Sequence, residues 1–228
     1  MKVTAIVLAA GSGKRMNSKV HKQYLLIDGK PVLYYSLNAF EESDVDNVVL
    51  VVGADEIEYC KKEIVERYGF GKVCAIVEGG KERYHSVYEG LKAAGETDYV
   101  LIHDGARPFL TQDIIKRTIV SVVEHRACVV GMPVKDTIKI VDNETYAKDT
   151  PDRANVWQVQ TPQAFSYELV YDAYTRMLAS DESGITDDAM VVERMTDYKV
   201  KLIEGSYRNI KITTPEDLLV AEAYLKNI

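Results

Sequence analysis

A glycine-rich loop near the N-terminus lies beside several basic side chains. Residues 9–13 (AAGSG) follow an apolar run at residues 3–8, and Lys14, Arg15 and Lys22 come soon after. Glycine permits positive φ and has no Cβ, so successive backbone N–H groups can converge on phosphate oxygens. The nearby cations would add positive charge there. The pattern predicts a site for a phosphorylated ligand, and the alternative is an ordinary turn before a solvated basic helix.

Two well-known phosphate loops do not match these residues. A dinucleotide fingerprint, G-x-G-x-x-G, would need a third glycine where Met16 stands, and Gly11 and Gly13 are too close together for a P-loop. The first mismatch argues against a nicotinamide oxidoreductase. The loop is instead similar to the N-terminal loop of nucleotidyltransferases. In those enzymes, charge and positioning act on a nucleotide while a phosphorylated acceptor provides the attacking oxygen.

A glycine pair, Gly79 and Gly80, follows the strand predicted at residues 73–77 and precedes a predicted helix. Without side chains, the main chain there can pass close to a flat base, and Ser86, one turn into the helix, can offer a hydroxyl to it. A pyrimidine base could therefore be read there by the backbone. A tight turn followed by a solvated serine is the alternative.

Asp104 is the candidate metal ligand. It directly follows the strand predicted at residues 99–103, so its carboxylate would lie at the carboxyl end of a buried strand. Facing a triphosphate, it could hold Mg²⁺ or another divalent cation, which prefers oxygen ligands and keeps water and substrate phosphates around it. Capping of the following turn is the alternative. His103 would point to the other side of the strand and is predicted to be packed.

Lys211 lies between Ile210 and Ile212 in a segment predicted as a short strand. Because neighbours in a strand alternate sides, its ammonium would point away from both isoleucines and into the cleft. A solvated lysine at a sheet edge is the alternative. A helix should follow, with Thr214 as its cap and Pro215 at its first position.

The elements that must hold these residues alternate between strand and helix patterns. Strands are predicted at residues 3–8, 47–52, 73–77, 99–103 and 127–133, and helices at residues 31–40, 55–68, 82–94 and 111–124. Thr111 and Thr186 are predicted N-caps, and residues 161–165 should lead into a helix from Ser166. Repeated βα units imply a three-layer α/β fold, with a mainly parallel sheet and ligands beyond the carboxyl ends of its strands.

Residues 134–158 break this alternation. Two β-rich runs are separated by a polar stretch with no helix between them, which predicts a long, hairpin-like β-arm. An arm that projects from a compact body exposes apolar residues unless something covers them. A second copy of the chain is the simplest partner that would bury these apolar residues. We therefore expect a homodimer in which the arm contributes to the interface.

Composition limits the possible functions. With 228 residues, 46% apolar and 28% charged, the chain suits a single domain spanning residues 1–228. A net charge of -7 disfavours general binding to nucleic acid or to an anionic membrane. Cys60, Cys74 and Cys128 are too few and too far apart for a disulfide framework, and no signal peptide or membrane-length apolar run is present. We therefore expect a cytoplasmic enzyme with reduced thiols.

Together the motifs resemble the family of 2-C-methyl-D-erythritol 4-phosphate cytidylyltransferases of the non-mevalonate isoprenoid pathway. The resemblance covers nearly the whole chain through LAAGSGKRM, HKQYL, GGKERYHSV, HDGARPF, PVKDTIK, DRANVWQVQTPQAF, ITDDA and EGSYRNIKITTPEDL. It implies a Rossmann-like sheet of the nucleotidyltransferase type and a Mg²⁺-dependent transfer of CMP from CTP to a polyol phosphate. Leu8 stands where many members have proline, and Lys81 where many have aspartate, which leaves contacts around the ribose open.

Carried over residue by residue, the resemblance implies three groups of site residues. Arg15 and Lys22 would stabilise charge on the triphosphate, while Arg153 and Lys211 would hold the acceptor phosphate. The nucleotide would contact Ala9, Ala10, Gly11, Gly13, Gly79, Gly80, Arg83 and Ser86. The acceptor would contact Arg107, Thr137, Arg153, Thr186 and Lys211, partly from the arm of a second subunit, and Asp104 would lie near the metal.

Two other functions stay open at this point. Ribitol-5-phosphate cytidylyltransferases share KQ, HD, RPF, TPQ and NIK with this chain, but they usually differ at residues 133–137, at the Asp152-Arg153 pair and at Trp157. A catalytically silent nucleotide-binding or regulatory protein on the same fold is the second alternative. Such a protein would have no physical need for several charged side chains converging on one cleft.

Overall fold

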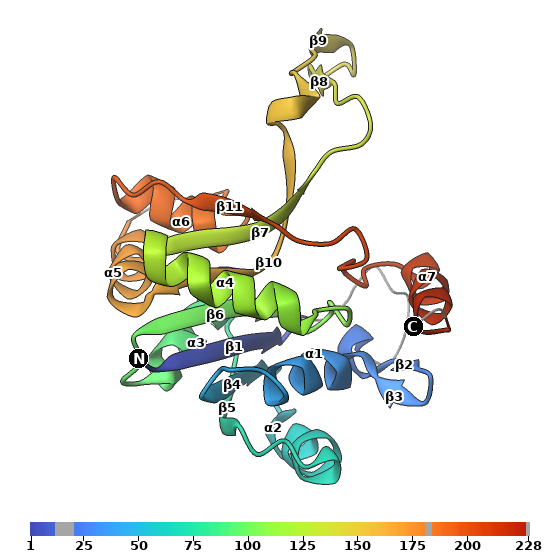
Figure 1. Ribbon diagram of the computed structural model, residues 1–228, viewed down its shortest axis with the longest axis vertical. Coiled ribbons are helices and arrows are strands. Elements are labelled where there is room, and N and C mark those ends of the chain that lie inside the picture. The colour runs from blue at the N-terminus through green and yellow to red at the C-terminus, as the bar shows by residue number, and fades with distance from the viewer. Residues whose placement is uncertain (12–20, 181–183, 227–228) are drawn as a thin grey trace.

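A seven-stranded sheet forms the centre of the computed structural model, which describes residues 1–11, 21–180 and 184–226 (Figure 1). In chain order its strands are β1 (Val3–Ala9), β4 (Asn47–Val52), β5 (Val73–Glu78), β6 (Tyr99–Asp104), β7 (Ala127–Pro133), β10 (Trp157–Ser166) and β11 (Lys201–Glu204). Their spatial order is β11-β7-β10-β6-β1-β4-β5, and only β10 runs antiparallel to its neighbours. The predicted α/β fold with a mainly parallel sheet is confirmed.

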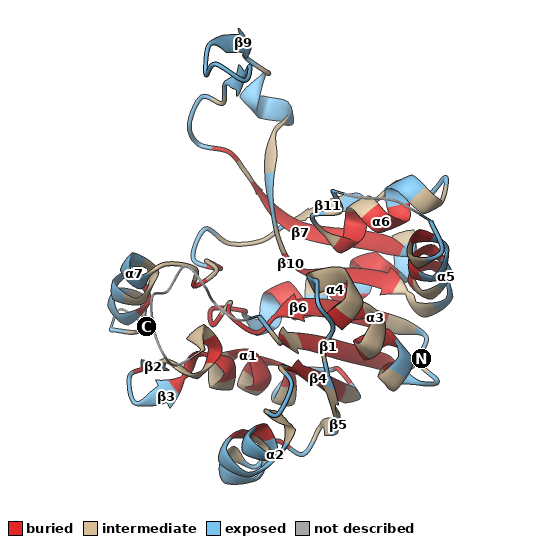
Figure 2. Cartoon of the chain, turned by 180° about the vertical axis from the view of Figure 1, so that it is seen from behind, coloured by how far each residue is buried: buried red, intermediate tan, exposed pale blue. Residues whose placement is uncertain are grey.

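Alternate residues of the inner strands face two helical layers. In β1 and β4, Val7 and Leu50 belong to one buried cluster and Ile6 and Val49 to the other. The first cluster is covered by α1 (Val32–Glu41), α4 (Gln112–His125) and the π-helical η3 (Cys60–Glu66), and the second by α3 (Arg83–Ala94), α5 (Tyr167–Leu178) and α6 (Asp188–Met195). Figure 2 shows buried residues concentrated in this layered body. No helix in the described part of the chain is long and apolar enough to cross a membrane.

Strand β10 is longer than the sequence indicates. Residues 161–165 lead into α5, with Ser166 as its N-cap, as predicted, but Gln163–Ser166 also pair with Tyr99–Ile102 of β6 inside the sheet. The pairing of β10 with β7 is interrupted between Val159 and Gln163, around Pro162. Because proline has no N–H to donate to a ladder, this interruption resembles the end of a strand when the sequence is considered alone.

The helix starts largely follow the predicted caps. Thr111 Oγ1 accepts a hydrogen bond from Ile114 N at 3.3 Å, and Thr214 forms a capping box with Asp217 ahead of α7 (Pro215–Leu225). Thr186 is not the cap of α6, because Asp187 Oδ1 accepts the bond from Met190 N at 2.9 Å. A carboxylate is an equally good acceptor one residue further along.

The segment around Lys211 is irregular. Strand β11 ends at Glu204, and the structure describes residues 205–214 with no strand among them, so the predicted short strand at Lys211 is wrong. Other bonds hold this loop. Gly205 N donates to Gly131 O at 2.8 Å, Asn209 Nδ2 donates to Thr161 O at 2.9 Å, and Ile212 N donates to Ala106 O at 2.8 Å.

The shorter elements lie at the periphery. They are η2 (Lys22–Tyr24), β2 (Leu26–Ile27), β3 (Lys30–Pro31), α2 (Ile57–Tyr59), β8 (Ile140–Val141), β9 (Ala147–Asp149) and η4 (Arg153–Asn155). Strands β8 and β9 pair at the tip of an arm that projects far from the body (Figure 1). Ile140, Val141 and Tyr146 on this arm are 48%, 50% and 69% exposed.

Candidate active site

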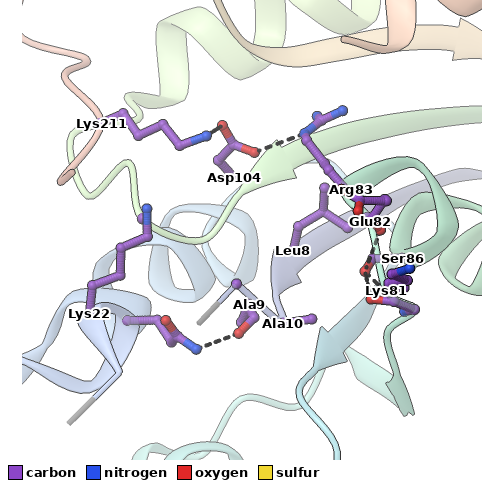
Figure 3. Close-up of a pocket in the computed structure, with 14 residues that line it drawn as sticks. Leu8, Ala9, Ala10, Lys22, Lys81, Glu82, Arg83, Ser86, Asp104 and Lys211 are labelled. Atoms are coloured by element: carbon purple, nitrogen blue, oxygen red, sulfur yellow. Dashed lines mark hydrogen bonds and ion pairs between the residues drawn. The ribbon is translucent and has the colours of Figure 1, made fainter. Parts of the chain in front are cut away.

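A cavity of about 350 Å³ lies beyond the carboxyl ends of β1 and β6 (Figure 3). It is lined by Leu8, Ala9, Ala10, Gly11, Lys22, Gln23, Gly80, Lys81, Glu82, Arg83, Ser86, Asp104, Ala106 and Lys211. The fold thus brings together most of the residues predicted to contact a nucleotide. Gly13 and Arg15, also predicted for this site, lie outside the described residues.

Gly79 shows why the loop after β5 needs glycine. A Cβ at this position would lie 2.6 Å from both Ala10 Cβ and Ser86 Oγ, much closer than real Cβ contacts. Ser86 is 5% exposed, and its hydroxyl accepts a bond from Gly80 N at 3.1 Å. Ser86 lines the cavity as predicted, but its hydroxyl also holds the glycine loop in place.

A second cavity, of about 300 Å³, adjoins the first. It is lined by Arg83, Asp104, Arg107, Val159, Gln160, Thr161, Gln163, Thr186, Asp187 and Lys211. Three of the predicted acceptor-binding residues, Arg107, Thr186 and Lys211, are therefore together. Arg83, Asp104 and Lys211 line both cavities, so two ligands bound in the two cavities would meet at these three side chains.

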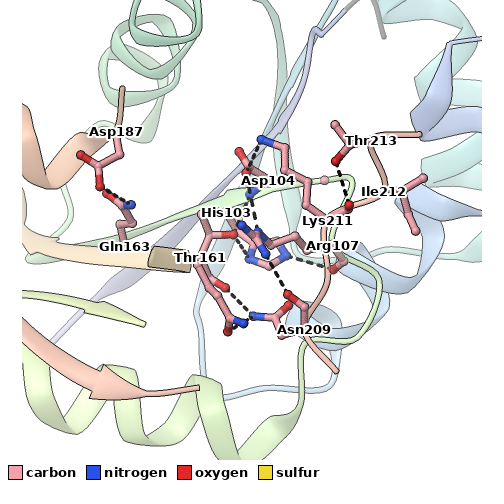
Figure 4. A network of polar contacts seen from close by, with 12 residues as sticks. His103, Asp104, Arg107, Thr161, Gln163, Asp187, Asn209, Lys211, Ile212 and Thr213 are labelled. Atoms are coloured by element: carbon pink, nitrogen blue, oxygen red, sulfur yellow. Dashed lines mark hydrogen bonds and ion pairs between the residues drawn. The ribbon is translucent and has the colours of Figure 1, made fainter. Parts of the chain in front are cut away.

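Asp104 is surrounded by cations at this junction (Figures 3 and 4). Its Oδ2 lies 2.8 Å from Lys211 Nζ and 3.7 Å from Arg107 Nε, and its Oδ1 lies 3.4 Å from Arg83 Nε. Burial alone would favour the protonated carboxyl, but Lys211, Arg83 and Arg107 outweigh it and hold the pKa of Asp104 well below its usual range. Asp104 is therefore an anion at neutral pH.

Arg83 is fixed by a second carboxylate. Its Nη1 and Nη2 each donate to Asp188 at 2.7 Å, and Asp188 is fully buried. Tyr174 OH donates to Asp188 Oδ1 at 2.5 Å, and Gln163 Oε1 accepts from Asp188 N at 2.9 Å. The two parallel bonds from Arg83 to Asp188 are the geometry in which arginine binds carboxylate most strongly. Five cations line the two cavities, against four carboxylates that line them or pair with Arg83, which leaves a small excess of positive charge suited to phosphate; the cations are Lys22, Lys81, Arg83, Arg107 and Lys211, and the carboxylates are Glu82, Asp104, Asp187 and Asp188.

His103 is packed behind Asp104, as predicted, and its protonation state follows from its neighbours (Figure 4). Its Nε2 lies 3.3 Å from Arg107 O, which can only accept, so Nε2 carries the proton. Burial lowers the pKa of His103 to about 4, so the ring is neutral and Nδ1 accepts from Thr161 Oγ1 at 3.0 Å. Thr161 Oγ1 also accepts from Asp104 N at 3.1 Å. This chain of bonds fixes the backbone that carries Asp104 and Arg107.

Lys22 enters the first cavity from η2, on the side opposite the glycine loop after β5. Its Nζ donates to Ile212 O at 3.1 Å, which places its ammonium near the loop that carries Lys211. The next residue, Gln23, is buried and donates from Nε2 to Ala9 O at 2.5 Å. Figure 3 shows Lys22 and Lys211 reaching toward the cavity from these two elements.

Two predicted acceptor residues lie elsewhere. Thr137 and Arg153 are on the arm, are exposed, and line neither of the two cavities. Arg153 Nη1 instead donates to Lys135 O at 3.2 Å, within the arm. A single copy of the chain therefore does not bring them to Lys211.

Asp104 fits one mode of binding a divalent cation. Within the described residues, no group of three or more His, Cys, Asp or Glu side chains is arranged to hold a metal ion. An all-protein cage is therefore not formed by these residues. Mg²⁺ commonly uses one or two carboxylates together with water and substrate phosphates, and a buried ionised aspartate beside the first cavity supplies one such oxygen donor.

The sequence analysis missed several residues that hold the site. Asp188, Gln23, Gln163 and Asn209 were not singled out from the sequence. Each acts through a long-range contact, such as Arg107 Nη1 donating to Asn209 O at 2.8 Å. Periodicity and local motifs carry no signal for such pairings.

Comparison with known proteins identifies the family. The family model for 2-C-methyl-D-erythritol 4-phosphate cytidylyltransferase matches residues 3–227. A protein of that name from Lachnoclostridium phytofermentans is 54% identical over 225 residues, which are 99% of this chain and 97% of that protein.

Solved structures agree with this match. The crystal structure of 4-diphosphocytidyl-2C-methyl-D-erythritol synthase from Anaerococcus prevotii has a TM-score of 0.88 and 39% identity, covering 99% of this chain and 96% of that one. The cytidylyltransferase from Thermus thermophilus has a TM-score of 0.78 and 30% identity, covering 97% and 98%. The chain therefore belongs to the 2-C-methyl-D-erythritol 4-phosphate cytidylyltransferase family.

Proposed function

We propose that the protein transfers CMP from CTP to 2-C-methyl-D-erythritol 4-phosphate, giving 4-diphosphocytidyl-2-C-methyl-D-erythritol and pyrophosphate. The observation that carries this proposal is the pair of adjoining cavities that share Arg83, Asp104 and Lys211. One cavity has the glycine loops suited to a nucleotide, and the other has Arg107 and Thr186 for an acceptor. Membership of the family supports the choice of substrates.

The reaction needs positive charge more than it needs a base. An acceptor phosphate oxygen attacks the α-phosphorus of CTP, a new P–O bond forms, and the bond to the pyrophosphate leaving group breaks. A phosphate monoester is already largely dianionic near neutral pH, so no side chain has to remove a proton. Negative charge grows on the triphosphate oxygens as the leaving group departs, and Lys22, with Arg15, would stabilise it. Lys211 lies where the acceptor phosphate would meet the nucleotide.

We assign Asp104 as the protein ligand of Mg²⁺ or another divalent cation. When bound, the cation would neutralise triphosphate charge and help to orient the phosphates. Asp104 is ionised and lines both cavities, which supports this role. One of its oxygens is paired with Lys211, so a cation would compete with that ammonium for the carboxylate.

We infer further that the protein is a homodimer and acts in the cytoplasm. The dimer is supported by the exposed apolar side chains on the arm and by the position of Thr137 and Arg153, which could reach an acceptor cavity only in another subunit. The cytoplasmic location rests on the sequence and on the free thiols of Cys60, Cys74 and Cys128.

The product formed from CTP and 2-C-methyl-D-erythritol 4-phosphate tests the reaction itself. ³¹P NMR should show a new diphosphate diester and free pyrophosphate, both dependent on a divalent cation. CTP without acceptor should stay intact, because the attacking oxygen belongs to the acceptor. Release of CMP into water would indicate a hydrolase, and absence of any product would favour the silent nucleotide-binding alternative.

A further inference from the structure

The carboxylate of Glu56 gathers three hydrogen bonds beside η2, the turn that carries Lys22. Its Oε1 lies 2.6 Å from His21 Nδ1, and its Oε2 accepts from Tyr24 OH at 3.0 Å and from Gly53 N at 2.9 Å. The Glu56 side chain is only 16% exposed, so these partners replace most of its water. The carboxylate therefore connects the segment after β4 with the segment that contains η2.

The residues that Glu56 holds lie on either side of Lys22. His21 precedes Lys22, Tyr24 follows it, and Gln23 between them is tied to β1 through Ala9 O. Element η2 is a single 3-10 turn, whose backbone bonds include Tyr24 N to His21 O at 2.9 Å and Leu25 N to Lys22 O at 3.3 Å. So short a turn depends on side-chain contacts to keep its place.

Tyr24 extends the network into the core. Its hydroxyl proton goes to Glu56, so the contact of 3.1 Å with Cys60 Sγ is made by the thiol proton donating to Tyr24 OH. Burial raises the pKa of Cys60 to about 11, which keeps that proton in place at neutral pH. Burial likewise raises the pKa of Tyr24 well above its usual value, so Tyr24 remains a donor to Glu56.

We propose that Glu56 is a positioning residue for Lys22: it fixes the η2 turn through His21 and Tyr24, and so sets where the Lys22 ammonium meets the nucleotide triphosphate. The inference rests on the proposed function, because it assigns Lys22 to the triphosphate. The four-carbon stem of lysine has a fixed maximum reach. The location of the Lys22 backbone therefore limits which phosphate oxygens its ammonium can contact. Glu56 itself would not touch the substrate.

Steady-state kinetics of Glu56→Ala test this role. We expect kcat to fall at least tenfold while the KM for 2-C-methyl-D-erythritol 4-phosphate changes less than threefold. Glu56→Gln should keep kcat within about threefold of wild type, because an amide can still accept from Gly53 N and Tyr24 OH. Glu58→Ala is the matched control: Glu58 is an exposed acid in the adjoining α2, and its removal should leave all constants unchanged.

A double variant separates positioning from general loss of structure. If Glu56 acts through Lys22, adding Glu56→Ala to Lys22→Ala should lower kcat less than twofold further, whereas independent effects would multiply. Tyr24→Phe removes one of the three donors, and we expect a smaller fall in kcat, about threefold. Wild-type kcat in Glu56→Ala, or a full multiplication of the two effects, would overturn the proposal.

Hydrogen exchange provides a readout that does not depend on activity. In Glu56→Ala, the amides of Tyr24 and Leu25 should exchange at least tenfold faster than in wild type, while those of β6 should not change. Unchanged protection of these two amides would overturn the proposal even if kcat fell. A wild-type protein that formed no product would contradict the proposed function instead, and the exchange experiment would still decide whether Glu56 holds the turn.

Discussion

Lys211 Nζ lies 2.8 Å from Asp104 Oδ2, which joins the irregular loop after β11 to the carboxyl end of β6. Both side chains line both cavities. The ammonium thus sits where a nucleotide and an acceptor phosphate would come together, and it already rests against the carboxylate assigned to the metal. This pair is the centre of the proposed site.

Replacing Lys211 with glutamine should weaken acceptor binding selectively. The neutral side chain cannot attract the acceptor phosphate, so we expect its KM to rise at least tenfold, while the KM for CTP rises less than threefold. Steady-state kinetics with each substrate varied in turn would measure both. Lys201→Gln, at an exposed lysine in β11, is the control and should behave as wild type. Equal increases in both constants would contradict a selective acceptor role.

His103 should make stability depend on pH between about 6.5 and 4. The unfolded histidine has a pKa near 6.5 and the folded one about 4, so the unfolded chain binds more protons in this window. Stability is therefore fully present above pH 6.5 and falls as the solution is acidified, by about 3 kcal/mol in total. Urea denaturation at pH 7.5 and 5 would measure the slope between them. His103→Gln should flatten it, and His125→Gln, at the protein surface, should not.

Replacing Asp188 with asparagine should destabilise the fold. The change breaks an ion pair whose Asp188 side is fully buried and leaves Arg83, 29% exposed, with Asp104 as its remaining carboxylate, so we expect a loss of about 3 kcal/mol, the low end for a broken buried pair. The free energy of unfolding from urea titration would measure it. Asp172→Asn removes an exposed ion pair with Arg176 and should cost less than about 1 kcal/mol. Similar losses in the two variants would show that Asp188 contributes no more than a surface carboxylate.

Deleting residues 141–150 should separate the subunits of the proposed dimer. The deletion removes the tip of the arm with part of its exposed apolar surface, and it shifts Arg153 relative to a partner. Sedimentation velocity at micromolar concentration should therefore show a monomer in place of the dimer. The KM for the acceptor should rise in the same variant. A full-length protein that is monomeric and fully active would contradict the role given to the arm.

Local signals in the sequence predicted most of the site because those residues follow strands. Gly79, Gly80 and Asp104 come at the carboxyl ends of β5 and β6, and parallel strands bring such ends to one edge of the sheet. Lys211 was placed in the cleft correctly but on the wrong element, because two flanking isoleucines resemble a strand. Its loop is shaped by tertiary bonds instead.

The supporting contacts could not be predicted in the same way. Asp188 and Arg83 are far apart in the chain, and their pairing depends on how α5 packs against both α3 and α6. The second half of β10 was also missed, since Pro162 interrupts its pairing with β7. In each case the local sequence was compatible with more than one conformation or pairing, and tertiary packing determined which one formed.

The choice of acceptor tests the central claim most directly. Purified protein with CTP and Mg²⁺ would be given 2-C-methyl-D-erythritol 4-phosphate or ribitol 5-phosphate, and kcat/KM would be measured from pyrophosphate release. We predict at least a hundredfold preference for 2-C-methyl-D-erythritol 4-phosphate, about 3 kcal/mol in transition-state binding. Equal use of the two acceptors, or a preference for ribitol 5-phosphate, would contradict the account.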